Sequence, residues 1–75
     1  MNPDDQRSAL DKADHNIELA RRRIARQRAV VKQLEALRGD VSTALTLLRT
    51  LEDTLTAMES HRVLIMARIL NLNQG

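Results

Sequence analysis

Two long stretches of the chain contain neither glycine nor proline, and this constrains the fold more than any other feature. Proline occurs only at Pro3, and glycine only at Gly39 and at the last residue, Gly75, so that residues 4–38 and 40–74 contain neither. Glycine and proline are the residues that most often interrupt helices. The sequence therefore predicts one domain, 1–75, with a helix at about 3–38, a turn at 39–41 and a helix at about 42–72.

The composition also favours an all-α protein. The 75 residues include no cysteine and no aromatic residue, so that the core must consist of Leu, Ile, Val, Met and Ala. With abundant Arg, Asp and Glu, this is the composition of helices and coiled coils. A chain this short buries only about 60% of its unfolded surface and usually needs reinforcement. Because disulfides are excluded, self-association is the expected reinforcement.

Helix-capping residues occur at both ends of the predicted helices. Asn2 is a good N-cap, and Pro3 suits the first helical position, where its missing N–H costs nothing. Gly39 is the natural left-handed residue to end the first helix. Asp40 or Ser42 can cap the second helix. The capping pattern therefore agrees with the boundaries predicted from the chain breakers.

Apolar residues recur at alternating spacings of three and four along both helices. The first stripe is Leu10, Ala13, Ile17, Ala20, Ile24, Gln27, Val31 and Leu34, and the second is Val41, Ala44, Leu48, Leu51, Leu55, Met58, Arg62, Ile65, Ile69 and Leu72. Each stripe has one polar break, at Gln27 and at Arg62. Such sustained spacing predicts a coiled coil, and the short turn makes the helices antiparallel neighbours. The predicted fold is an antiparallel two-helix hairpin.

Pairing the two stripes gives a specific register. The predicted layers are Ile17 with Ile65, Ile24 with Met58, Val31 with Leu51 and Leu34 with Leu48, with Gln27 opposite Leu55 and Arg62 opposite Ala20. The arginine head of Arg62 is expected to reach water or Glu18. The flanking positions then pair Arg21 with Glu59 and Arg28 with Glu52. These opposite charges support the register, although exposed pairs add little stability.

More large apolar residues are present than one hairpin seam can cover. A helix that is apolar beyond one stripe is buried on more than one side. The simplest closure is a two-fold homodimer that forms a four-helix bundle. The predicted dimer interface is Val30, Leu37, Leu45, Leu47, Val63, Leu64, Met66 and Leu70. The sequence leaves open whether the assembly is a dimer or a tetramer, and how its hairpins are oriented.

The stretch RRRIARQR, from Arg21 to Arg28, raises the question of nucleic-acid binding, although the net charge is only +2. Arg22 can pair with Glu18 four residues before it. The predicted contacts for an outside partner or a nucleic acid are Arg22, Arg23, Arg26 and Lys32. A few cations without aromatic stacking partners make a weak, salt-sensitive binder of nucleic acid. Protein binding is therefore the first hypothesis, and RNA or DNA binding is the alternative.

The residues needed for catalysis are missing from the sequence. It has no cysteine nucleophile, no glycine-rich loop, no G-x-S-x-G elbow and no H-E-x-x-H pair. His15 points away from the partner helix and His61 lies on a flank, so that the two cannot converge on a metal within one hairpin. We therefore expect no enzyme activity, no cofactor and no metal site.

The hydropathy pattern favours a cytoplasmic protein. The first residues, MNPDDQ, are acidic and lack the apolar run of a signal peptide. The longest nearly apolar run, VLIMARIL, is far shorter than the roughly 20 residues that span a bilayer. A membrane-surface role needs a helix whose apolar face is available to lipid. In the predicted hairpin this face is buried against the other helix. That role ranks last among the three hypotheses.

The segments IELARRRIARQRAVVKQLEALRGD, ALTLLRTLEDTL and HRVLIMARI carry a resemblance to a protein group. From about Ala13 to Leu70 the chain resembles short uncharacterised helical-hairpin proteins of alphaproteobacteria, rhizobia among them. The resemblance is carried by the RRIARQR block, the glycine before the second helix and the adjacent pair His61 and Arg62. It implies a helical hairpin and carries no assigned activity.

Overall fold

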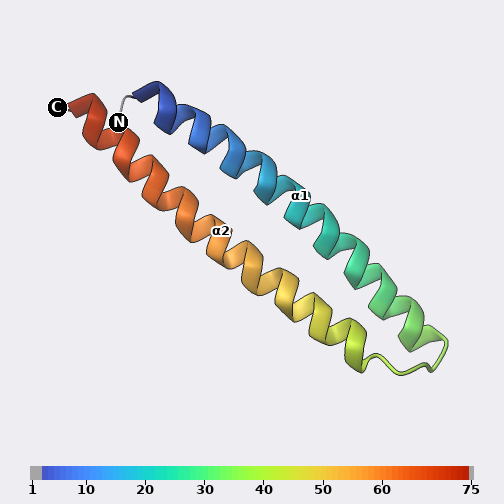
Figure 1. Ribbon diagram of the computed structural model, residues 1–75. Helices are drawn as coiled ribbons and strands as arrows, with labels where there is room; N and C mark the ends of the chain where they lie inside the picture. Colours follow the sequence, from blue (N-terminus) through green and yellow to red (C-terminus); the bar gives the residue numbers. More distant parts are fainter. Residues whose placement is uncertain (1–2, 75) are drawn as a thin grey trace.

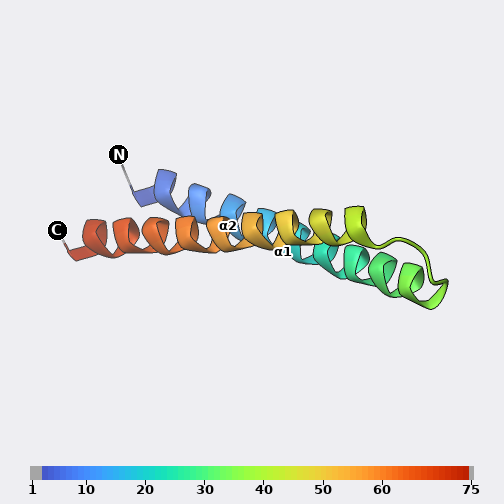
Figure 2. The ribbon, with the colours of Figure 1, turned by 90° about the horizontal axis from the view of Figure 1, so that it is seen from below.

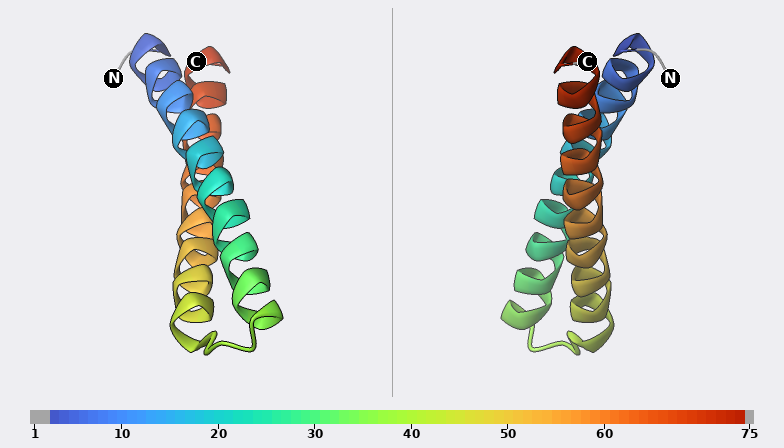
Figure 3. Two further views of the ribbon diagram at one scale, coloured as in Figure 1. Left: turned by 90° about the vertical axis from the view of Figure 1, so that its right-hand side faces the viewer. Right: turned by 90° about the vertical axis from the view of Figure 1, so that its left-hand side faces the viewer.

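The computed structural model is a hairpin of two antiparallel helices, α1 over Pro3–Ala36 and α2 over Ser42–Gln74 (Figure 1). It describes the fold of residues 3–74 and the side chains of residues 5–72. The hairpin measures 58 × 14 × 14 Å, and its helices cross at a shallow angle (Figures 2 and 3). No strand occurs within residues 3–74. The all-helical hairpin predicted from the sequence is confirmed.

The end of α1 differs from the prediction by two residues. The helix ends at Ala36, and the left-handed residue is Arg38, with φ of 56°, whereas Gly39 has no positive φ. The N–H of Gly39 donates to the Leu34 carbonyl at 2.8 Å, and the N–H of Arg38 donates to the Glu35 carbonyl at 3.0 Å. These two bonds form a Schellman motif in which Arg38 occupies the place where glycine is usual. The prediction that Gly39 takes the left-handed conformation is wrong.

The start of α2 is capped by Asp40, one of the two residues predicted for this role. Its Oδ1 accepts a hydrogen bond from the Ser42 N–H at 2.9 Å, which is an Asx-turn. The first helical bond follows, from the Leu45 N–H to the Val41 carbonyl at 2.8 Å. Hydrogen bonding from the Ser42 side chain and backbone lowers the pKa of Asp40. The ionised carboxylate therefore favours the folded turn.

The cap at Asp40 predicts a defined pH dependence. Because its pKa is lower in the folded state, its charge stabilises the fold above the unfolded pKa, near 3.8, and this contribution is lost as the pH falls through the folded pKa. Asp40→Asn keeps the side-chain acceptor and removes the charge. We expect the variant to have the lower melting temperature at pH 7. Melting curves followed by circular dichroism should show this difference shrinking between pH 5 and pH 2.5, and a constant difference would contradict the role of the charge.

The core of the hairpin is a single seam between the two helices. The buried apolar residues are Ile17, Ala20, Ile24 and Val31 of α1 and Ile65 and Ile69 of α2. Among the described residues, no large side chain is less than 2% exposed. Gln6 is also buried, so that the seam extends beyond Leu10, where the predicted stripe begins. All of these residues except Gln6 belong to the predicted stripes, and the thinness of the core follows from having only two helices.

The polar break at Gln27 lies opposite a different part of α2 from the one predicted. Its Nε2 donates to the backbone carbonyl of Ala44 at 2.9 Å, and its side chain lines a hollow with Leu51. Leu55, the predicted opposite residue, does not line this hollow. Gln27 and Leu51 are each twelve residues from Gly39 in the sequence. Gln27 therefore meets a part of α2 that is nearer to the turn than predicted.

Arg62 shows the same displacement. Instead of lying over Ala20 with its head toward water or Glu18, it donates from Nε to the Oδ1 of Asp14. The physical reason is the turn, because α1 ends three residues before Gly39 and α2 begins three residues after it. A symmetric turn places residues equidistant from its centre at the same level of the hairpin. The predicted layers are therefore displaced by about one helical turn.

Candidate interaction surface

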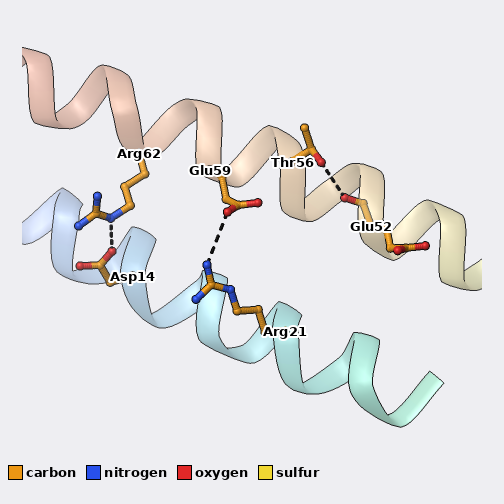
Figure 4. A network of polar contacts seen from close by, with 6 residues as sticks. All are labelled: Asp14, Arg21, Glu52, Thr56, Glu59 and Arg62. Atoms are coloured by element: carbon orange, nitrogen blue, oxygen red, sulfur yellow. Dashed lines mark hydrogen bonds and ion pairs between the residues drawn. The ribbon is translucent and has the colours of Figure 1, made fainter. Parts of the chain in front are cut away.

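One side of the hairpin is occupied by ion pairs, and we call it the ion-paired flank. Arg21 lies 3.5 Å from Glu59 and Arg28 lies 3.3 Å from Glu52, as predicted. Arg62 pairs with Asp14 on this side, and the hydrogen bond to that carboxylate raises the pKa of Arg62 (Figure 4). Most of these side chains are about half exposed. Such pairs help to set the helix alignment more than they stabilise the fold.

The opposite side of the hairpin contains a hollow of about 320 Å³, which we call the basic hollow. Its lining residues are Arg23, Arg26, Gln27, Val30, Leu47 and Leu51. Arg23 and Val30 are seven residues apart, with Arg26 between them, so that all three lie on one side of α1. The buried residue Ile24 separates this side from Arg21 on the ion-paired flank.

The two arginines of the basic hollow lack acidic partners. Among residues 5–72, no ion pair or hydrogen bond involves the side chain of Arg23 or Arg26. Six cations and no acidic residue occur in residues 21–32, and the acidic residues of α2 that do pair lie on the ion-paired flank. The guanidinium groups of Arg23 and Arg26 are therefore available to an anionic group from outside the chain.

The four cations predicted to contact a partner do not form one group. Arg22 is paired within α1, with its Nη2 2.7 Å from Oε1 of Glu18, as the sequence predicted. Lys32 is exposed but does not line the basic hollow. Only Arg23 and Arg26 lie together in a recess. The part of its lining that comes from α2, Leu47 and Leu51, could be identified only from the register of the two helices.

The predicted dimer residues lie on more than one face. Val30 and Leu47 line the basic hollow, whereas Val63 lines a hollow of the ion-paired flank. Six of the eight residues are exposed, by the fractions Val30 41%, Leu37 76%, Leu47 48%, Val63 66%, Leu64 56% and Leu70 53%. The remaining two, Leu45 and Met66, are half-buried. The set therefore divides into a group beside the turn and a group in the C-terminal half of α2.

Both histidines are exposed. His15 lies on α1 and His61 lies on α2. Within the described part of the chain, no three His, Cys, Asp or Glu residues gather in a way that could hold a metal ion. Neither helix is long and apolar enough over its described residues to cross a membrane.

Comparison with other proteins identifies no relative. The chain matches no protein-family model, no curated protein and no solved structure with which it was compared.

Proposed function

We propose that the chain is a non-enzymatic protein-interaction module, a helical hairpin that dimerises into a four-helix bundle and binds another protein. The observation that carries this proposal is the number of large apolar side chains left exposed beside so thin a seam. Seven such residues are at least 38% exposed, namely Val30, Leu37, Leu47, Val63, Leu64, Leu70 and Leu72. Single exposed apolar residues are ordinary, whereas clusters of them are typical of interaction surfaces.

The C-terminal half of α2 supports self-association best. Val63, Leu64 and Leu70 are each more than half exposed, and Val63 and Leu70 lie seven residues apart on one side of the helix. Their neighbour Ala67 is small and exposed, which permits close approach of a second helix. A two-fold contact between two such surfaces would bury these residues and add the second layer that the seam lacks.

This proposal predicts a dimer that two substitutions dissociate. Sedimentation equilibrium between 1 and 200 µM should give a mass near twice the 8.5 kDa of one chain. Val63→Asp with Leu70→Asp should weaken the dimer by about 100-fold, because two buried apolar contacts are replaced by desolvated charges. Thr43→Asp with Thr46→Asp adds the same charge to exposed residues near the turn and should leave the dimer intact. A folded wild-type chain that sediments as a monomer at 200 µM would refute self-association.

Nucleic-acid binding is a second candidate, favoured by the unpaired arginines Arg23 and Arg26. In a dimer they supply four cations, which predicts an affinity for a 20-base-pair duplex that falls about 100-fold between 50 and 200 mM salt. Arg23→Ala with Arg26→Ala should abolish this binding, while Lys32→Ala with Arg49→Ala should weaken it less. Fluorescence anisotropy measures both effects. No binding of duplex or single-stranded RNA or DNA at 50 mM salt would eliminate this candidate.

A further inference from the structure

The charges of the hairpin are distributed unequally between its two sides. On the ion-paired flank, Arg21 and Arg28 form ion pairs with carboxylates of α2. The basic hollow has two guanidinium groups, and none of its lining residues is acidic. Because no carboxylate of the chain pairs with Arg23 or Arg26, electrostatic complementarity favours an anionic occupant of the hollow.

The basic hollow is also apolar in a pattern suited to a helix. Val30, Leu47 and Leu51 line the hollow together with the arginines, and Leu37 follows Val30 by seven residues, just beyond the end of α1. Val30, Leu37 and Leu47 are all more than 40% exposed. Residues 23–36 of α1 extend for about 20 Å at 1.5 Å per residue, which matches about four turns of a partner helix. Helices that bind in such grooves insert apolar residues at spacings of three and four.

A second copy of the chain fits this surface poorly. A two-fold contact through the basic hollow would bring four arginines into one interface, with no acidic lining residue on either side to pair with them. A nucleic acid would supply phosphates to pair with the arginines but no apolar surface to cover the exposed leucines. The chain has no aromatic residue on which bases could stack. An acidic helix satisfies both the cationic and the apolar parts of the lining.

We propose that the basic hollow is the docking groove for an amphipathic, acidic helix of a partner protein, which would complete a three-helix arrangement with α1 and α2. Carboxylates on one edge of the partner helix would bind Arg23 and Arg26, and its apolar residues would pack on Val30 and Leu47. The inference rests on the proposed interaction function and names the chemistry of the partner. It places partner binding on a surface different from the self-association surface on α2.

The test uses two labelled helical peptides of sixteen residues. Both have leucines at alternating spacings of three and four, and their flanking positions are all Glu in the acidic probe and all Lys in the basic probe. Fluorescence anisotropy at 150 mM salt should show at least tenfold tighter binding of the acidic probe. Arg23→Glu with Arg26→Glu should weaken binding of the acidic probe at least tenfold and strengthen binding of the basic probe. The gain in binding of the basic probe also shows that the variant is folded. Lys32→Glu with Arg49→Glu carries the same charge change outside the hollow. Its affinity for the acidic probe should stay within about twofold of that of the wild type.

The apolar part of the groove is tested separately. Val30→Ser with Leu47→Ser should lower the affinity for the acidic probe about tenfold. If the groove acted by charge alone, this affinity would not change. The inference would be overturned if the two charge-reversed pairs weakened binding of the acidic probe equally. It would also be overturned if a 20-nucleotide RNA displaced the acidic probe and itself required Arg23 and Arg26 for binding. A wild-type dimer that prefers neither probe would refute the groove and leave self-association standing. A monomer that binds the acidic probe at the hollow would refute self-association and support the groove.

Discussion

Ile24→Ala should lower the free energy of unfolding by about 2–4 kcal/mol, the usual cost of a large-to-small change in a packed core. Ile24 is only 4% exposed and lies near the middle of the single seam. The total stability of a 75-residue domain is about 4–11 kcal/mol, so that this loss is a large fraction of it. At 4–8 °C for each kcal/mol, the melting temperature should fall by about 10–30 °C. Urea denaturation followed by circular dichroism at 222 nm measures the change.

Val30→Ala is the matched control for this prediction. Val30 is on the same helix but is 41% exposed in the isolated hairpin, and its truncation should cost less than about 1 kcal/mol. Both variants are compared with wild type at one protein concentration, because association changes the apparent stability. If Ile24→Ala cost no more than Val30→Ala, the seam would not be the main source of stability.

Arg38→Gly should stabilise the hairpin by about 1 kcal/mol and raise the melting temperature by about 4–8 °C. Arg38 has a φ of 56°, a conformation that costs a residue with a side chain about 1–2 kcal/mol and costs glycine little. Part of this gain is offset because glycine is more flexible in the unfolded chain. Thermal denaturation of the variant measures the net effect.

Gly39→Ala tests the same turn from the neighbouring position. A Cβ at Gly39 would lie 3.5 Å from the Leu34 Cδ2 and 3.6 Å from the Leu34 carbonyl oxygen, which is ordinary contact. Because Gly39 has no positive φ, alanine should be neutral or stabilise the fold by up to about 1 kcal/mol. If Gly39→Ala destabilised the hairpin and Arg38→Gly did not stabilise it, the left-handed residue would be Gly39, as the sequence alone suggested.

The composition of the seam could be predicted because burial follows the 3-4 spacing of apolar residues directly. Ile17, Ile24 and Val31 are all buried, as the first stripe requires. The register could not be predicted as well. Arginine and glutamate side chains are long enough to bridge helices displaced by about one turn, so that the pair Arg21 and Glu59 forms in either alignment. The charge pairs therefore supported a register that the turn geometry does not adopt.

The alignment of the helices depends on how the turn closes, which the apolar spacing does not specify. Ile24 was expected level with Met58, but it lines a hollow with Leu55, one helical turn closer to Gly39. The ending of α1 depends on whether Arg38 or Gly39 takes the left-handed conformation, and glycine preference alone selected the wrong residue.

The candidate site was predictable only in part. Arg23 and Arg26 share a side of α1 through their spacing of three, and the sequence placed both among the partner contacts. The presence of Leu47 and Leu51 beside them depends on the register, because these residues come from the other helix. The sequence therefore indicated the cations, but the apolar residues that α2 places beside them could be identified only once the arrangement of both helices was known.

The hairpin also has a defined response to mechanical load. The described ends of α1 and α2 lie together at the end of the rod opposite the turn (Figure 1). Tension applied between these ends would open the seam from Ile69 and Ile65 toward Val31, one layer at a time, instead of shearing all layers together. Because the layers of a hairpin loaded in this way separate in succession, it yields at a lower force than one whose layers must all shear together.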